Sequence, residues 1–507
     1  MFAQPESRAG ENSFHDLLYD WLEHTPWLAL SAAAHLLAYF LLTAIPWSEF
    51  REPDVVVLHA SVLEPTPEVI DEPEPPLPEE PEPVEQSEPE LVSESEDVVS
   101  APVEDFVGTS DELFPAQEAG FEQTGNESLR MLGLGVGSDG KLGPRVGGRG
   151  QIPRGSGVEP ALEDALAWLA AHQGEDGSFD GDGFSRRCGR IGATTCGGPG
   201  SAVHDVGLTA LALLAFLGDG HTSEQGAYRE VVARGLAWLR DQQDPDSGLI
   251  GERTSRDFLY DHALATLALC EAFYFTRSPR LKRPAQNAVN VILQARNPYG
   301  AWRYDLPPVG DSDTSVTGWM VFALASAKEA GLHGDFDAAF AGALGFLDEV
   351  SDPASGRVGY SAFGELSART AANEHFPRES NEAMTAVGLL CRIFLGQKPE
   401  TNPLLAKHAE LVRSKPPVWD PAGYTTDMYA WYYGTYALYQ MGKPWWPSWE
   451  KALRAAVVDS QRKDGDERGS WDPVCAWGTS GGRVYATALM TLTLEVYFRY
   501  GRVLGAR

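Results

Sequence analysis

The stretch that decides the fold is PALEDALAWLAAHQGEDGSF, residues 160–179, in which an amphipathic helix runs into a turn rich in Gly and Asp. The same arrangement occurs six times between residues 160 and 500, and a more apolar helix follows each turn. A repeat of roughly 45–70 residues is a supersecondary unit that cannot bury its own apolar face, so it must stack on its neighbours. Six stacked helix pairs predict a closed ring.

The apolar helices are predicted to line the inside of the ring and the amphipathic helices to form its outside. This predicts an all-α fold, a toroid of six helical hairpins around a central cavity. The amphipathic helices are expected at residues 160–173, 227–243, 280–296, 335–350, 403–415 and 447–461, and their apolar partners are expected to begin at Asp205, Asp261, Asp313, Asn381, Asp427 and Gly481.

Acidic residues are concentrated outside these repeats. The chain has 507 residues and a net charge of -32, and residues 52–129 hold 23 Asp or Glu residues and no Lys or Arg. The chain is therefore a near-neutral domain with an acidic tether. Nucleic acid is not an expected partner, because its recognition requires clustered Lys and Arg.

An apolar run near the N-terminus predicts a membrane anchor. Residues 27–47 (WLALSAAAHLLAYFLLTAIPW) contain no Asp, Glu, Lys or Arg. As a helix they would span about 31 Å, close to the hydrocarbon thickness of about 30 Å. Trp27 and Trp47 stand at the two ends, where aromatic belts lie. We expect one transmembrane helix that attaches the chain to a membrane.

The segments around the run set the expected domain organisation. A short segment (1–26) precedes the transmembrane helix (27–47), and a disordered Pro/Glu-rich spacer (48–130), a Gly-rich linker (131–157) and the ring (158–507) follow it. Ser31 and His35 lie four residues apart in the span, on one helix face, and a His within a membrane is a functional hypothesis in itself.

Residues 20–105 resemble the N-terminus of TonB-type energy transducers, which carry Ser-x-x-x-His in a single span before a Pro/Glu-rich spacer. The resemblance implies a bacterial inner-membrane protein whose ring is periplasmic, and it implies that Ser31 and His35 face a proton-driven motor complex. The Lys-Pro half of the spacer and the small C-terminal receptor-binding domain of that family are absent here. A simple membrane anchor remains the alternative.

The turns of the ring carry a second pattern. Gln173, Gly177 and Phe179 fit Gln-x-x-x-Gly-x-Trp/Phe, and looser versions occur at 294–302 and 461–471. These are the QW repeats of squalene cyclases and protein prenyltransferases, which residues 158–507 resemble throughout. The resemblance implies an α/α toroid. The α-macroglobulin thioester domains share this toroid, but their Gly-Cys-Gly-Glu-Gln motif occurs nowhere in the sequence.

The resemblance makes residues 311–315 (Asp-Ser-Asp-Thr-Ser) a candidate catalytic motif. Asp313 matches the central acid of the Asp-x-Asp-Asp-Thr motif of squalene–hopene-type cyclases and Asp311 the first acid, whereas Thr314 replaces the neighbouring Asp. Ser315 stands where the prenyltransferase zinc thiolate would be. We therefore expect no metal and no cofactor at this position, and a cyclase would use Asp313 as its general acid.

Several further residues are predicted at one mouth of the ring. An Asp that opens a helix caps it, and this alone explains Asp205, Asp261, Asp313 and Asp427. With His204 and His262 beside them, the same acids can also form a site for acid–base or metal chemistry. Trp319, Tyr429 and Trp431 are expected to add aromatic rings to the cavity, with packing against outer helices as the alternative.

The five cysteines do not predict a metal site. Cys188 and Cys196 flank a Gly-rich loop, where they form either a disulfide or free thiols, and a zinc site would need two more ligands.

Three functions follow from these features. We favour a tethered binding or scaffold module that takes a peptide, glycan or lipid. The alternatives are a cyclase-like enzyme acting on an isoprenoid through Asp313, and a TonB-like energy transducer.

Overall fold

The computed structural model describes residues 35–37, 148–189, 195–298 and 300–500. The chain divides into two units, Met1–Leu113 and Phe114–Arg507. In the first unit the described residues are 35–37, which are helical and include His35. Ser31 and the rest of the predicted span at 27–47 lie outside the described residues. No helix in the described part of the chain combines the length and the apolar composition needed to cross a membrane.

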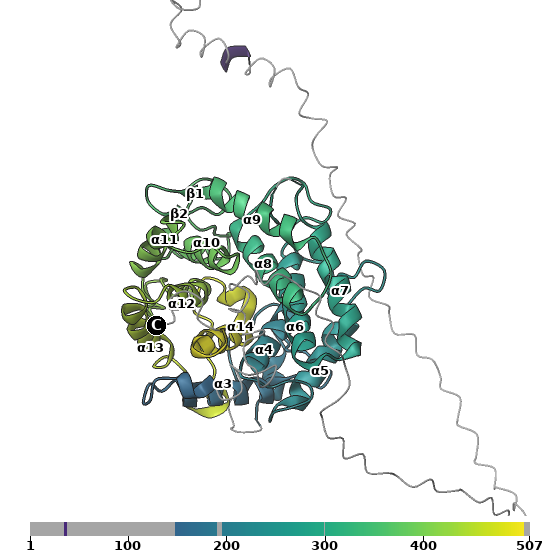
Figure 1. The fold of residues 1–507 in the computed structure, drawn as a ribbon. Coiled ribbons are helices and arrows are strands. Elements are labelled where there is room, and N and C mark those ends of the chain that lie inside the picture. Colours follow the sequence, from purple (N-terminus) through teal and green to yellow (C-terminus); the bar gives the residue numbers. More distant parts are fainter. Residues whose placement is uncertain (1–34, 38–147, 190–194, 299, 501–507) are drawn as a thin grey trace, which may run out of the picture. The chain divides into compact units, whose positions relative to one another are not determined.

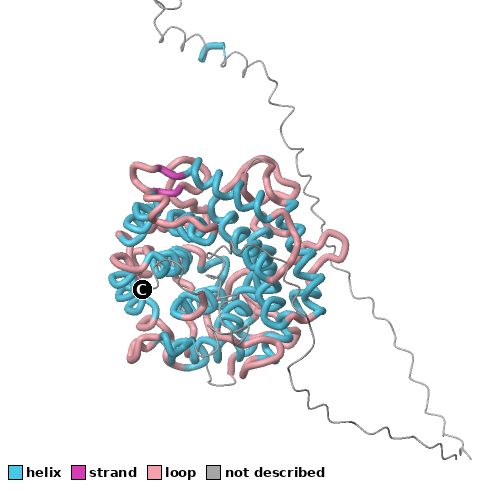
Figure 2. Tube along the Cα trace, viewed as in Figure 1, coloured by secondary structure: helices cyan, strands magenta, loops and turns pink. Residues whose placement is uncertain are grey.

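Twelve α-helices occur in the described part of the second unit, and they form six consecutive hairpins (Figure 1). The hairpins are α3 (Val158–His172) with α4 (Asp205–Gly218), α5 (Arg229–Asp241) with α6 (Phe258–Thr276), α7 (Pro279–Gln294) with α8 (Thr314–Glu329), α9 (Phe336–Val350) with α10 (Ala383–Phe394), α11 (Leu404–Arg413) with α12 (Met428–Met441), and α13 (Trp446–Val457) with α14 (Gly478–Leu494). Helix dominates the ring, and the one described sheet is the short antiparallel pair β1 (Ser351–Asp352) and β2 (Arg357–Val358) (Figure 2).

The second helices of the hairpins form a closed inner circle. Helix α4 packs on α6, and the contacts continue through α8, α10, α12 and α14 back to α4. The first helices lie outside this circle, and each packs on its hairpin partner or on the preceding inner helix. The predicted all-α toroid of six hairpins is therefore confirmed in the described residues.

Burial explains which helix of each pair is inside. Every residue of α4 from Val206 to Gly218 is buried, as expected for a helix that is surrounded on all sides. The outer helix α7 instead buries one stripe, formed by Leu281, Ala285, Ala288, Val289 and Ile292. This stripe has the spacing of a single helix face.

Some inner helices begin at other residues than the sequence suggests. Helix α6 begins at Phe258, three residues before Asp261, so Asp261 lies in the first turn and does not cap the helix. Helix α10 begins at Ala383 instead of Asn381, and α14 begins at Gly478 and has a kink at Gly482. The shift of α6 turns the Asp261 side chain away from its own helix end and toward a neighbouring helix.

Three of the four Gln residues in the repeated turns join consecutive hairpins, whereas Gln294 is exposed. The side-chain amide of Gln173 donates to the carbonyl of Gly177 in its own turn and to Val231 of the next outer helix, at 2.9 Å each. Gln243 makes the same pair of bonds to Gly248 and Pro284, at 3.0 Å each. Gln461 donates to Gly469 and Ala161 at 3.0 and 2.7 Å. One side chain thus satisfies a turn and fixes the next repeat beside it.

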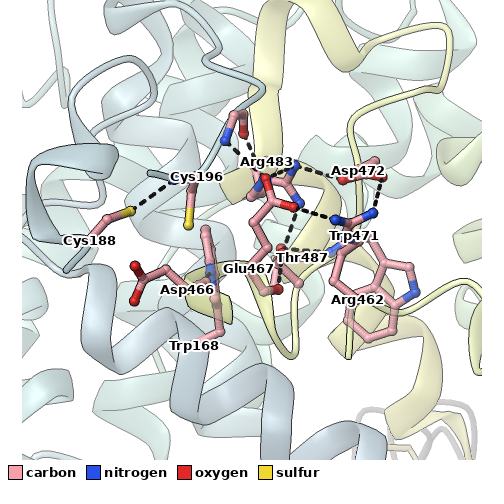
Figure 3. Close-up of polar contacts among 12 residues, drawn as sticks. Trp168, Cys188, Cys196, Arg462, Asp466, Glu467, Trp471, Asp472, Arg483 and Thr487 are labelled. Atoms are coloured by element: carbon pink, nitrogen blue, oxygen red, sulfur yellow. Dashed lines mark hydrogen bonds and ion pairs between the residues drawn. The ribbon is translucent and has the colours of Figure 1, made fainter. Parts of the chain in front are cut away.

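The bond from Gln461 to Ala161 closes the ring, because it joins the last hairpin to the first helix. We call this junction the seam, and Figure 3 shows polar residues on both sides of it, among them Trp168 and Arg483. Here the indole of Trp168 in α3 donates to the carbonyl of Asp466 at 2.9 Å. Arg468 pairs with Asp164 at 3.0 Å. The seam therefore uses the same kind of joint as the other repeats, with ion pairs added.

A buried charge network fills the ring at the C-terminal ends of the inner helices. The guanidinium of Arg499 is 1% exposed and donates to Glu271 at 3.0 Å, to Glu495 at 2.9 Å and to the carbonyl of Leu214 at 2.7 Å. These contacts tie α4, α6 and the end of the chain together. Side chains therefore occupy the interior at this end, and open space remains at the opposite end.

Candidate functional site

A cavity of about 400 Å³ lies inside the ring at the N-terminal ends of the six inner helices. The residues that carry its chemistry are His204, Arg256, Asp257, Tyr260, Asp261, Arg303, Tyr304, Trp319, Tyr360, Arg369, Asp427, Tyr429, Trp477 and Tyr485. Each inner helix carries a partial positive charge at its N-terminus. The cavity therefore favours ligand atoms that are negative or rich in electrons.

A histidine and a carboxylate from neighbouring inner helices meet in this cavity. Nδ1 of His204, at the start of α4, lies 3.3 Å from Oδ2 of Asp261 in the first turn of α6. This hydrogen bond raises the pKa of the imidazole, and burial raises the pKa of Asp261 in spite of its partner. The pair can therefore hold or exchange a proton.

A second pair stands at the opposite wall. Arg369 lies in the loop before α10, and its guanidinium donates to Oδ2 of Asp427 at 3.2 Å. Asn381 donates to the same oxygen at 2.9 Å. The other oxygen of Asp427 accepts from the backbone N–H of Ala430 and caps α12. Capping and the second contact thus coexist, and each carboxylate oxygen has its own role.

Aromatic side chains form much of the remaining wall. Trp319 of α8 stacks on Tyr432 with ring centroids 5.7 Å apart. The hydroxyl of Tyr429 lies 2.7 Å from Oγ of Ser315, the position where the prenyltransferase resemblance would require a thiolate. The guanidinium of Arg256 lies over the ring of Tyr304 at 4.4 Å. Aromatic rings and charged groups therefore both line the cavity.

Asp313 lies outside the cavity lining and is fully buried. Its Oδ1 accepts from the backbone N–H of Val316 at 2.8 Å and caps α8, whereas Oδ2 has no hydrogen-bond partner. The Nε atom of Arg303 lies 3.9 Å from this Oδ2. Burial raises the pKa of Asp313 to about 7. A protonated carboxyl group is therefore stable here, behind residues such as Arg303 and Ser315 that line the cavity.

The structure places four other predicted site residues away from the cavity. Asp311 points outward with 67% of its side chain exposed, paired with Arg303 at 2.9 Å. Asp205 accepts from the backbone N–H of Gly181 at 2.8 Å, and burial raises its pKa to about 7. The indole of Trp431 packs near Trp419, with ring centroids 6.5 Å apart. The fourth residue is His262.

His262 has a structural role that the sequence did not reveal. Its Nδ1 accepts from the backbone N–H of Ile250 at 3.0 Å, and Nε2 lies 3.1 Å from the carbonyl of Ala288. In other repeats a Thr hydroxyl on the inner helix accepts the matching turn N–H. Thr209 accepts from Phe179, and Thr385 accepts from Val358. His262 replaces that Thr, and burial lowers its pKa to about 4.

Tyr260 of α6 and Tyr485 of α14 line the cavity from inner helices, and the other cavity residues that sequence reasoning missed come mostly from loops. Arg256, Arg303, Tyr304, Tyr360 and Arg369 precede inner helices and belong to no periodic pattern. The sequence offers one signal for these loop residues. Each lies in the segment that leads to the N-terminus of an inner helix. The free thiols Cys188 and Cys196 lie near His172, and none of these three lines the cavity.

No protein-family model and no curated protein matches the chain. Solved structures do match. An inactive variant of an alpha-1,6-mannanase of Salegentibacter sp. HEL1_6 in complex with alpha-1,6-mannotriose is 12% identical, with a TM-score of 0.44 over 68% of this chain and 99% of that one. The unsaturated glucuronyl hydrolase of Bacillus sp. GL1 is 14% identical, with a TM-score of 0.47 over 68% and 96%.

A type II terpene cyclase of Scytonema, in complex with merosterolic acid A, is 12% identical, with a TM-score of 0.40 over 68% of this chain and 96% of that one. At these identities and scores the neighbours carry no argument about activity. What this protein does has to be inferred from its own residues.

Proposed function

We propose that this protein is a membrane-anchored binding module whose ring holds a short, polyhydroxylated ligand, such as one or two units of a glycan, in the cavity at the N-terminal ends of its inner helices. The predicted span at 27–47 would attach the ring to the inner membrane of a bacterium, with the ring in the periplasm. The acidic spacer would keep the ring at a distance from the bilayer.

The observation that carries this proposal is a cavity of about 400 Å³ that is lined by both charged side chains and aromatic rings. That volume lies within the range of small-molecule sites, about 300–1,000 Å³. Carboxylates and guanidinium groups such as Asp257 and Arg256, which line the cavity, can exchange hydrogen bonds with hydroxyl groups. Trp319 and Trp477 also line the cavity, and an indole surface can pack on the C–H side of a sugar.

Two charged side chains of the lining disfavour a pure hydrocarbon ligand. Arg256 and Asp257 border the cavity and are exposed or partly exposed. An isoprenoid chain would remove water from these two groups and give them no hydrogen bonds, which costs free energy for each group. Polar oxygens would also meet the positive ends of six helices. These groups therefore favour a ligand that has hydroxyl groups beside its apolar faces.

The test measures saccharide binding by the full-length chain. A panel of neutral and acidic di- to tetrasaccharides is titrated calorimetrically against the wild type and against Trp477→Ala and Arg256→Ala. Both residues line the cavity and are partly or fully exposed. Matched controls are Trp445→Ala and Arg229→Ala, which have similar exposure and do not line the cavity.

We expect at least one saccharide to bind the wild type, and we expect each cavity variant to weaken it about tenfold, the loss of roughly 1.4 kcal/mol. The saccharide affinity of the control variants should stay within about twofold of the wild-type value, a difference under about 0.5 kcal/mol. A panel without any binder, or equal affinities in cavity and control variants, would refute the proposal.

A cyclase-like enzyme is the second candidate, and one observation favours it. The carboxyl of Asp313 has a pKa of about 7 and an oxygen without a hydrogen bond, and the cavity tyrosines Tyr260 and Tyr360 lie close enough to interact with it electrostatically. Incubation with squalene and prenyl diphosphates tests this function. A product that disappears in Asp313→Asn would establish the enzyme and displace the binding module.

A further inference from the structure

Two cysteines and a histidine converge beside the seam, outside the cavity. Nε2 of His172, at the end of α3, lies 3.5 Å from Sγ of Cys188 and 3.5 Å from Sγ of Cys196. All three donor atoms lie within 4.8 Å of one another. His172 is 2% exposed and Cys196 5% exposed, so this is a buried cluster and not a chance meeting of surface side chains.

The distances from the imidazole nitrogen to the two sulfurs match a tetrahedral metal site. Zinc binds imidazole nitrogen at about 2.0–2.1 Å and thiolate sulfur at about 2.3 Å with tetrahedral angles, which places the nitrogen and sulfur about 3.5 Å apart. Both nitrogen-to-sulfur distances in the cluster are 3.5 Å. A disulfide would use the two sulfurs alone and would give no reason for an imidazole nitrogen at equal distance from both.

The histidine is oriented as a metal ligand. Its Nδ1 lies 2.8 Å from the carbonyl of Trp168, which fixes the proton on Nδ1 and leaves the lone pair of Nε2 directed at the sulfurs. A carbonyl acceptor on the far nitrogen is the usual support of a ligating histidine. The ring also stacks on Trp168, with centroids 4.1 Å apart. Both contacts hold the imidazole in one orientation before any ion binds.

The loop that carries Cys196 is held from the other side of the seam. Arg483 of α14 donates to the carbonyl of Gly197 at 2.7 Å, and Glu467 accepts from the Gly197 N–H at 3.1 Å. The backbone N–H of Cys196 itself donates to Sγ of Cys188 at 3.2 Å (Figure 3). The first and the last hairpins thus position the ligands together.

We propose that His172, Cys188 and Cys196 form a zinc site that fastens the loop after α3 at the seam of the ring. Two thiolates and one imidazole suit zinc better than magnesium or calcium, which prefer oxygen ligands. The described residues supply three donors, so a water molecule or an external group takes the fourth position. The site is independent of the cavity and of the function proposed for it.

The test measures metal content on the full-length chain, purified without chelator or metal-affinity resin. Elemental analysis should give about one zinc per chain for the wild type. Cys188→Ser/Cys196→Ser should contain less than a tenth of that amount. The matched control Cys391→Ala, which removes a buried thiol from α10, should keep the wild-type content.

A second measurement on the wild type does not depend on the variants folding. The chain is stripped with chelator, and Co²⁺ is added stepwise. We expect a thiolate-to-cobalt charge-transfer band that saturates at one ion per chain and disappears when zinc is added. The proposal is overturned if no such band forms, or if non-reducing peptide mapping finds Cys188 and Cys196 joined in a disulfide and the metal content equals that of the double variant.

Discussion

At the residue scale, Asp313 partly fits both roles that the sequence predicts for it, that of a helix cap and that of an unusual acid. It caps α8 through Oδ1, as a helix-opening Asp should. Its second oxygen is buried without a hydrogen bond, and burial raises its pKa to about 7. The motif 311–315 located an unusual acid, although Asp311 points outward and the acid does not face the cavity.

The pKa of Asp313 predicts a pH dependence of stability. In the unfolded chain the group titrates near 3.9, so between about pH 4 and pH 7 the folded state binds more protons than the unfolded state. The contribution of Asp313 to the free energy of unfolding is therefore full below about pH 4 and is lost as the pH rises to about 7. The change is on the order of 4 kcal/mol for a shift of this size.

Asp313→Asn isolates this effect, because Asn keeps the cap and cannot ionise. Relative to the wild type, the variant should gain stability as the pH rises from 4.5 to 8, as measured by denaturant unfolding at several pH values. Asp335→Asn, at the exposed cap of α9, controls for the change in capping. If the difference in free energy of unfolding between variant and wild type does not vary with pH, Asp313 is ionised throughout the range from pH 4.5 to 8.

Sequence reasoning reached some of the cavity residues and missed others for a physical reason. His204, Asp261, Trp319, Asp427 and Tyr429 lie near the starts of inner helices, where the repeat fixes their position, and all of them line the cavity. Arg256 and Tyr360 come from loops whose path depends on tertiary packing. His262 looked like a rim residue because its hydrogen bonds to Ile250 and Ala288 leave no trace in the sequence.

At the element scale, the joints between hairpins depend on close backbone contact. Gly469, in the last turn, has φ of 90°, and a Cβ there would lie 2.1 Å from the carbonyl oxygen of Asp164 in α3. The sequence marked this glycine through the Gln461…Gly469…Trp471 pattern. The pattern shows where a joint forms, but it does not show that the joint at Gly469 closes the ring onto its first helix.

Gly469→Ala should therefore loosen the seam. We expect it to lower the free energy of unfolding by about 2–4 kcal/mol, because a strained backbone and a steric clash act together. Gly331→Ala is the matched control. Gly331 has φ of 76° but open space around its Cβ position, so only backbone strain of about 1 kcal/mol remains. Denaturant unfolding measures both variants, and equal losses would show that the clash at the seam has no effect.

The cysteine–histidine cluster is a feature that sequence motifs do not predict. His172 and Cys188 are 16 positions apart, and Cys188 and Cys196 are eight apart. This order and spacing match none of the short zinc motifs. His172 also lies in an amphipathic helix, where its position predicts a core residue. The three side chains meet only because the loop after α3 folds back over the end of that helix.

At the scale of the whole molecule, the ring was the most predictable feature because each repeat supplies its own evidence. The alternation of amphipathic and apolar helices fixed the number of hairpins and the inner circle. Repetition cannot indicate the ligand, because the cavity depends on what differs between repeats. The anchor and the spacer remain predictions, since residues 1–34 and 38–147 lie outside the described part of the chain.

The predicted anchor has a direct test that also separates the binding module from the energy transducer. Deletion of residues 1–50 removes the apolar run 27–47 but leaves the twelve described helices of the ring intact. The full-length chain should fractionate with membranes and resist extraction by carbonate. The deleted chain should be soluble, with an unchanged melting temperature and unchanged saccharide affinity, because no cavity residue is lost. A deleted chain that still sediments with membranes would contradict the anchor.

His35→Ala should stay in the membrane fraction, and a loss of cellular function in this variant alone, with the ligand still bound, would favour the motor-coupled transducer over a simple anchor.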